Sequence, residues 1–350
     1  MKPEQAELSS RALVETSVVG SQFVLRSTLR KVVDLAFART ALASGLVVIA
    51  LILWIGARLF IESGLTRRRY GASLITTSVW DVPHEIYGAL PFIFGTVVSS
   101  LLALLIAVPL GVGAALFLNE TAPKRLAVPL SFVIELLASI PSVIYGLWGF
   151  MVLCPFLQSH ISPWIASHLG ANPLFAGPPV LTNMLAAGSI LAIMILPIIT
   201  TISREVLRNV PAGQREAAMG LGSTKWEMLQ HIVLPEARSG ITGAVILALG
   251  RAIGETMAVV MVIGNTPQIS ASILQSGYTM PALLANQFNE AYNDELQRSA
   301  LIEVAFILFL VTLAFNILAR VLLRMTARKL SDGSPRNERS TSKVVGVPAT

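Results

Sequence analysis

The sequence predicts an all-α membrane protein that crosses the bilayer six times. Hydrophobic residues make up 54% of the 350-residue chain and charged residues only 13%, whereas a soluble domain carries about 25% charged residues. The apolar residues also fall into long uncharged runs, and a helix needs about 20 largely apolar residues to cross the hydrocarbon core. An ordinary cytoplasmic enzyme is excluded, because too few charged groups remain to cover a water-exposed surface of that size.

The positions of the spans follow from the uncharged runs and from the turn-forming residues between them. The run 136–203 contains no Asp, Glu, Lys or Arg and is long enough for two crossings, while the Pro, Gly, Asn and Ser residues of 160–183 favour a break. The six expected spans are residues 40–61, 95–118, 127–153, 184–203, 240–264 and 299–320. Residues 62–94 are then expected to form a periplasmic loop, and residues 95–325 a core of five membrane helices.

The distribution of basic residues predicts the orientation in the membrane. Segments 1–39, 119–130, 204–239 and 320–350 hold most of the 26 Lys and Arg residues, and such residues favour the cytoplasmic side of short loops. Both termini are therefore expected in the cytoplasm. The triplet of Arg67, Arg68 and Arg69 falls on the outer side and runs against this rule.

The two ends of the chain are less informative. The cytoplasmic segment 1–39 includes a basic amphipathic pattern at 25–37, which fits either an interfacial anchor or a helix that docks a partner. The polar segment 326–350 is expected to be a disordered cytoplasmic tail.

Nothing in the sequence indicates catalytic, redox or metal chemistry. Cys154 is the single cysteine and cannot form an intrachain disulfide, and the four histidines show no metal-ligand spacing. The net charge of +6 would suggest nucleic acid as a partner of a soluble chain. In a membrane protein the bilayer surface is the simpler explanation, so neither a cofactor nor a nucleic-acid partner is predicted.

The cytoplasmic loop 204–239 carries clear helix start and stop signals. Pro211 can occupy the first turn of a helix, where its missing N–H costs nothing. Gly222 can end that helix, because glycine is free to adopt a positive φ. Thr224 and Glu227 have the spacing of a capping box that starts a second helix, and Pro235 is expected to end it. The loop is therefore predicted to be a preordered pair of short helices, which transmits movement better than a flexible loop would.

The residues of this loop resemble the EAA motif of ABC-importer permeases. The resemblance covers Glu216, Ala217, Ala218, Gly222, Ile232, Leu234 and Pro235. It implies a type I permease with a MetI-like helix bundle, in which these residues dock onto a cytoplasmic ATPase dimer. The chain has no G-x-x-x-x-G-K-[ST] phosphate loop of its own, so another subunit would have to bind and hydrolyse ATP.

A charged pair lies inside the expected fifth span. Arg251 is placed near the bilayer centre, where an arginine costs roughly 2.5–3.5 kcal/mol on insertion scales. Glu255 lies four residues further on and can pair with it on one helix face. Gly250 and Gly254 have the small-xxx-small spacing that lets helices approach closely. The pair is either an internal salt bridge or an anion site, because a guanidinium offers paired donors to oxyanions such as phosphate.

Segment 249–259 resembles the fifth-span signature of the membrane subunits of phosphate ABC importers, and it is closer to the PstC type than to the PstA type. Segments 78–91 and 140–149 are similar to the same family. The resemblance implies that Arg251, Glu255 and Thr256 line the substrate pathway. It also implies a PstA-type second permease subunit and a periplasmic phosphate-binding protein as partners, in addition to the ATPase dimer.

The resemblance implies a permease subunit of an ATP-driven importer that moves inorganic phosphate across the bacterial inner membrane. From the residues alone, two other functions remain open. An arginine binds any tetrahedral oxyanion, so the cargo of the same permease class could be sulfate, molybdate or phosphonate. An ion-coupled secondary transporter could instead use Arg251 and Glu255 as a proton relay, although such a protein has no need of an ATPase docking motif.

Overall fold

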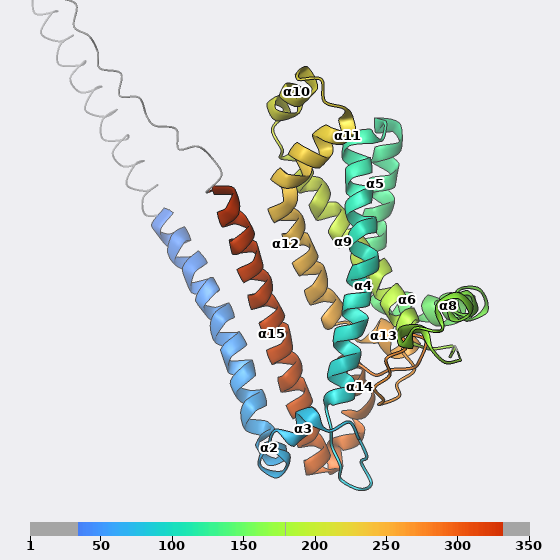
Figure 1. The fold of residues 1–350 in the computed structure, drawn as a ribbon. Helices are drawn as coiled ribbons and strands as arrows, with labels where there is room; N and C mark the ends of the chain where they lie inside the picture. The colour runs from blue at the N-terminus through green and yellow to red at the C-terminus, as the bar shows by residue number, and fades with distance from the viewer. Residues whose placement is uncertain (1–33, 179, 332–350) are drawn as a thin grey trace, which may run out of the picture. The chain divides into compact units, whose positions relative to one another are not determined.

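The computed structural model describes residues 34–178 and 180–331, which are almost entirely helical (Figure 1). The chain divides into two compact units, Met1–Ile61 and Glu62–Thr350. The described residues of the first unit belong to an apolar helix, Asp34–Glu62, of 29 residues. At 1.5 Å per residue this helix is about 44 Å long, which is enough to cross a bilayer. The amphipathic pattern at 25–37 lies largely outside the described residues.

The second unit contains all the remaining described helices (Figure 1). They are α2 (Gly64–Tyr70), α3 (Ser73–Thr76), α4 (Leu90–Leu116), α5 (Lys124–Ser139), α6 (Ser142–Trp148), α7 (Cys154–Phe156), α8 (Ser162–Leu169), α9 (Met184–Arg208), α10 (Ala212–Gly220), α11 (Lys225–Met228), α12 (Leu234–Ile253), α13 (Met257–Val262), α14 (Met280–Gln287) and α15 (Glu295–Ser331). π-Helical turns at Phe117–Thr121, Gly149–Leu153, Leu157–Ile161 and Leu229–Val233 join several of them. Within this unit α10 and α11 lie at one end and α2, α3 and α14 towards the other.

Six helices among the described residues are long and apolar enough to cross a membrane, which confirms the predicted all-α, six-span fold. They are Asp34–Glu62, Leu90–Thr121, Ser142–Leu169, Met184–Arg208, Lys225–Ile253 and Glu295–Val321. The second of these spans begins earlier than expected, at Leu90. Helix α15 continues to Ser331, into the segment expected to be disordered, because its sequence MTARKLS contains good helix formers. The rest of that tail lies outside the described residues.

The core of the second unit forms around α9. About two thirds of the apolar stretch of α9 is buried inside the chain, against less than a third for α4 or α12. Ile190, Leu191 and Ile195 of this helix are almost completely buried. At Gly188 an added Cβ would lie 2.5 Å from the Leu102 side chain of α4, so glycine is required for the close packing of the two helices. A buried helix in the middle of the bundle gives α4 and α12 a common surface to pack on.

The expected third span, 127–153, is wrong as a single continuous helix. Helix α5 ends at Ser139, and the chain is extended at Ile140, with φ −69° and ψ 130°, before α6 begins at Ser142. The cause is Pro141, whose ring disfavours the helical conformation of the residue before it. The apolar stretch long enough to span is instead Ser142–Leu169, which includes part of the segment 160–183 expected to form a break.

The expected fifth span, 240–264, also has different bounds. Pro235 does not end a helix but lies in the first turn of α12, directly after the π-helical turn Leu229–Val233. The wider π turn relieves the clash between a proline ring and the preceding turn, so the helix passes through. At its other end α12 stops at Ile253, and a separate short helix, α13, begins at Met257. The break between them lies at Gly254, next to the predicted charged pair.

Candidate functional site

Helix α10 follows the start and stop signals of its sequence. Pro211 stands at the N-cap with φ −58°, and the helix ends at Gly220. Gly222 adopts a φ of +87°, which residues with a Cβ rarely do. Thr224 then caps α11: its side chain accepts from the Glu227 N–H, and the Glu227 carboxylate accepts from the Thr224 N–H at 2.8 Å. The predicted pair of short helices is confirmed, and we call α10 and α11 together the elbow. Their start and stop signals could be predicted because each acts through contacts between residues close in the sequence.

The outer side of this elbow carries charged and apolar side chains together. Glu216 and Ala217 are exposed, whereas Ala218 is buried against the body of the chain. Leu221 is 89% exposed and Trp226 68% exposed. Such large apolar side chains at an exposed turn are typical of a protein interface, where Trp often dominates the binding energy. We call Glu216, Ala217, Leu221 and Trp226 the elbow surface. The remaining motif positions are half-buried: Ile232 lies in the π-helical turn Leu229–Val233, and Leu234 and Pro235 begin α12.

The inner side of the elbow is anchored to the ends of the membrane helices. A small apolar cluster joins them; its members are Ala115, Leu207, Val210, Ala218, Met228, Leu229, Val233 and Ala237. Arg215 forms an ion pair with Glu120, in which Nη1 lies 2.6 Å from Oε1. The same guanidinium donates from Nη2 to the Leu207 carbonyl at 2.6 Å. Neither Arg215 nor Glu120 was found by sequence reasoning, because 95 residues separate them and no local pattern links them.

The predicted charged pair forms, and its two partners differ in exposure. Nη2 of Arg251 lies 3.3 Å from Oε2 of Glu255. The Glu255 side chain is only 3% exposed and the Arg251 side chain 51% exposed. The second carboxylate oxygen of Glu255, Oε1, accepts from the Ala258 N–H at 3.3 Å and so caps the start of α13. A buried carboxylate is thus held by two partners, while the guanidinium keeps donors available to a ligand.

The break after α12 is held in place by α6. A Cβ at Gly146 would lie 2.8 Å from the Met261 sulfur and 2.9 Å from the Ala258 Cα, so α6 and α13 are in close contact. Gly149 makes a similar contact with Ile190 of α9. Segment 140–149 therefore supplies the surface against which α13 is packed. Thr256 stands at the N-cap of α13, where its hydroxyl donates to the Gly254 carbonyl at 3.4 Å.

One face of α12 is not covered by the described chain. We define it by Gly243, Leu247, Arg251 and Gly254, which lie on one side of the helix at spacings of four, four and three residues. Leu247 is 61% exposed, and an added Cβ at Gly243 would meet no described atom within 4 Å. The close helix approach predicted for Gly250 and Gly254 is not made within the described chain, since a Cβ at Gly250 would also meet open space there. A half-exposed arginine on such a face requires cover from protein or water.

The arginine triplet at the opposite end is largely paired. Arg67 forms an ion pair with Glu303 of α15 at 3.3 Å, and Arg69 with Glu85 at 2.6 Å. The Thr66 N–H also donates to the Ser299 hydroxyl at 3.1 Å, so α2 is fixed to α15. Two of the three positive charges that run against the orientation rule are thus paired with nearby carboxylates.

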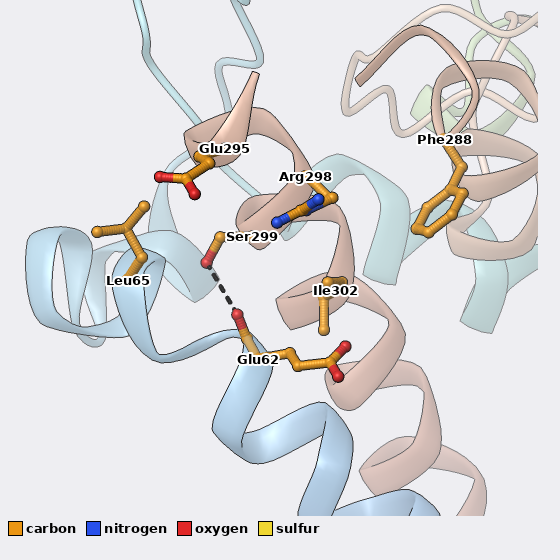
Figure 2. Close-up of a pocket in the computed structure, with 7 residues that line it drawn as sticks. All are labelled: Glu62, Leu65, Phe288, Glu295, Arg298, Ser299 and Ile302. Atoms are coloured by element: carbon orange, nitrogen blue, oxygen red, sulfur yellow. Dashed lines mark hydrogen bonds between the residues drawn. The ribbon is translucent and has the colours of Figure 1, made fainter. Parts of the chain in front are cut away.

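Beside this contact lies a cavity of about 560 Å³ (Figure 2). Leu65, Phe288 and Ile302 form its apolar wall, and Glu295 and Arg298 contribute charged groups. Its lining residues belong to α2, to the first turns of α15 and to the segments directly beside these helices. The cavity therefore belongs to a different part of the chain from Arg251 and Glu255.

Both candidate sites lie within a segment of the chain that matches a known family. Residues 107–332, which include both the elbow and the charged pair, match the binding-protein-dependent transport system inner membrane component. The chain belongs to this family. The match begins within α4 and continues through α15, and the helix Asp34–Glu62 lies outside it.

Curated relatives of this permease cover most of its length. One is the phosphate transport system permease protein PstC of Mesorhizobium japonicum, which is 45% identical over 84% of this chain and 91% of its own. The protein of the same name from Xylella fastidiosa is 48% identical over 74% of this chain and 81% of its own. A crystal structure of a bacterial alginate ABC transporter shares the fold, with a TM-score of 0.52 at 16% identity, over 80% of this chain and 93% of the other.

Proposed function

We propose that this chain is the permease subunit of an ATP-driven importer that moves inorganic phosphate across the bacterial inner membrane. The observation that carries the proposal is the 45–48% identity to phosphate transport permeases over most of the chain, including the segment with Arg251 and Glu255. The chemistry of that segment agrees with an anionic cargo, because a half-exposed guanidinium is a good donor to a tetrahedral oxyanion.

The elbow surface is the proposed contact with a cytoplasmic ATPase dimer. It combines the exposed Glu216 with the exposed apolar side chains of Leu221 and Trp226. A cytoplasmic ATPase requires that α10 faces the cytoplasm, and both termini then lie on the same side of the membrane. This orientation agrees with the excess of Lys and Arg in the segments expected there. A periplasmic phosphate-binding protein then delivers its cargo at the opposite end, where α2, α3 and α14 lie (Figure 1).

The open face of α12 is the proposed contact with a second permease subunit of the PstA type. Its glycines let another helix approach closely, and Leu247 supplies apolar contact area. A second subunit on this face would also enclose Arg251, which would otherwise meet hydrocarbon. The pathway for phosphate would therefore run between the two permease subunits, with Arg251, Glu255 and Thr256 along one wall.

Transport requires that the anion is bound only briefly on its way. Glu255 neutralises Arg251 in the empty state, at the rather long distance of 3.3 Å. When phosphate arrives, it competes with Glu255 for the guanidinium, while the other carboxylate oxygen keeps its bond to the Ala258 N–H. Binding is then weak, because each gain in contact to phosphate is offset by a loss of contact to Glu255. ATP binding and hydrolysis at the ATPases would move the elbow and turn the pathway from one side to the other.

Two other functions are less well supported. An importer of sulfate, molybdate or phosphonate would use the same guanidinium chemistry, but the relatives named above are phosphate permeases. An ion-coupled secondary transporter would need no ATPase, and the family match over the elbow makes this class the weaker alternative.

The proposal is tested by uptake of radiolabelled phosphate into proteoliposomes that contain this chain with its co-purifying partners. We expect uptake that requires ATP and that an excess of sulfate does not reduce. Competition by sulfate would retain the permease class and overturn the phosphate assignment. Uptake without any ATPase would overturn the role of the elbow.

A further inference from the structure

Helix α10 of the elbow has one small buried apolar residue and one large half-buried side chain that contacts the membrane helices. Ala218 is the buried residue of α10, and it is too small to hold the helix by apolar contact alone. Arg215 is only 22% exposed, whereas the neighbouring Glu216 is exposed. Its guanidinium lies between α10 and the body of the chain, so the position of α10 depends strongly on what Arg215 binds.

Arg215 connects α10 to the end of α9, eight residues earlier in the chain, and to Glu120, which lies 95 residues earlier. It belongs to α10, its ion-pair partner Glu120 lies in the π-helical turn that extends α4, and its second contact is the Leu207 carbonyl in the last turn of α9. Glu120 is 10% exposed and also accepts from the Asn119 amide at 2.7 Å, which fixes the carboxylate. The ion pair with Glu120 and the hydrogen bond to the Leu207 carbonyl are both 2.6 Å long, and a hydrogen bond from a guanidinium belongs to the stronger, charge-assisted class.

The segments that Arg215 joins lead to the charged pair. Helices α4 and α9 form the most extensive packing of the described chain, and α12 packs on both of them. Helix α12 carries Arg251 in its last turn. A movement of α10 can therefore reach Arg251 along the chain, through residues 209–211 into α9 and through α11 into α12, and also through the side chain of Arg215 into α4 and α9. With the chain connections alone, α10 could rotate about its two flanking turns without moving the bundle.

We propose that Arg215 and Glu120 form a brace that makes α10 move as one body with α4 and α9, so that ATP hydrolysis is coupled to phosphate movement. This inference rests on the proposed function. Arg215 and Glu120 are positioning residues in it: they touch neither the cargo nor the nucleotide, and they act through the placement of α10. The brace determines how much phosphate moves for each ATP, whereas the elbow surface determines whether the ATPase binds.

The test uses the complete complex in proteoliposomes and measures three quantities: ATPase co-purification, ATP hydrolysis and phosphate uptake. Glu120→Gln removes the charge but keeps an oxygen for the Asn119 amide. We expect normal co-purification, continued hydrolysis, and phosphate moved per ATP reduced by roughly 2- to 30-fold. Glu205→Gln is the matched control, since Glu205 is an exposed carboxylate at the same end of α9, and it should leave the ratio unchanged.

A second variant keeps the inference open to refutation if Glu120→Gln folds poorly. The exchange of both residues, Glu120→Arg with Arg215→Glu, restores the ion pair but loses the bond to the Leu207 carbonyl. The exchanged variant should therefore move more phosphate per ATP than Glu120→Gln does, but less than the unaltered chain. An unchanged ratio in Glu120→Gln would overturn the brace, and so would loss of ATPase binding, which would assign the pair to docking. If the unaltered chain itself fails to bind an ATPase, the proposed function fails instead.

Discussion

The Arg251 guanidinium and the Glu255 carboxylate lie 3.3 Å apart, yet Glu255 is 3% exposed and Arg251 is 51% exposed. A structural salt bridge would bury both groups to a similar degree. Here the carboxylate is held inside by the Ala258 N–H, and the guanidinium lies on the open face of α12. The asymmetry leaves donors of the arginine available to an anion, while its charge stays compensated when no anion is bound.

Arg251→Gln should reduce phosphate uptake at least roughly tenfold with the complex still assembled, because a charge-assisted contact to the anion is worth about 1.5–3 kcal/mol. Arg251→Lys should retain part of the activity, since it keeps the charge and loses the paired donors. Uptake is measured in proteoliposomes together with the yield of the complex. Unchanged uptake in Arg251→Gln would reduce Arg251 to a structural residue.

Exchange of the two charged residues separates a bundle salt bridge from an anion site. The double variant Arg251→Glu with Glu255→Arg restores opposite charges but places the carboxylate on the open face and the guanidinium inside. We expect assembly to recover and transport to remain low. Recovery of transport as well would weaken the anion-site role.

Glu216→Lys should abolish association with the ATPase while the chain still inserts into the membrane. Glu216 is exposed and forms no ion pair in the part of the chain that the structure describes, so the fold should not be affected. Trp226→Ala should weaken the same association by about 2 kcal/mol or more if Trp226 is an interface anchor. Both effects are measured as ATPase recovered with the tagged permease. Leu105, which is 73% exposed on the apolar helix α4, offers a control in Leu105→Ala, with normal ATPase recovery expected.

Gly243→Leu should prevent pairing with the second permease subunit and leave this chain folded. An added Cβ at Gly243 meets no described atom within 4 Å, so the larger side chain would project from the open face of α12. Gly240→Leu is the matched control, because a Cβ there would lie 2.5 Å from Val206 and should destabilise the chain itself. Thermal unfolding of the purified chain and recovery of the second subunit distinguish the two effects. Normal pairing in Gly243→Leu would place the second subunit elsewhere.

Tyr87→Phe should protect the protein against alkaline unfolding. Burial raises the pKa of the Tyr87 hydroxyl from 10.0 to about 12, and nearby acidic groups add to the shift. The folded state thus resists ionisation more than the unfolded state, so stability is complete below about pH 10 and is lost as the pH rises towards about 12. The hydroxyl has no hydrogen-bond partner among the described residues, so its removal should cost little near pH 7.

The measurement is the unfolding midpoint of the purified protein at neutral pH and at about pH 11. The substitution should leave the neutral value nearly unchanged and reduce the loss at high pH. Tyr70→Phe is the comparison, since the Tyr70 hydroxyl donates to the Glu85 carbonyl and that bond would be lost at every pH. An equal alkaline loss with and without the Tyr87 hydroxyl would contradict the prediction.

Helix positions and helix caps depend on residues that are close together in the sequence, so they could be predicted from the sequence alone. Long apolar runs require helices in a bilayer, and this alone led to six spans. The cap at Thr224, the positive φ of Gly222 and the start at Pro211 depend on neighbours within a few residues, so they hold whatever the rest of the chain does. The contact between Arg251 and Glu255 is equally local, and it formed although the helix ends just before Glu255.

Contacts between distant segments were decided by packing. The sequence contains no signal that brings Arg67 to Glu303 or Arg215 to Glu120, because such pairs arise only when helices meet. The helix break at Gly254 depends on α13 lying against Gly146. The open face of α12 is the side of this helix that α9 and α15 do not cover. Local residue order sets which helices form, but the competition of helix faces for a limited buried surface sets which side chains stay free to bind a ligand or a partner.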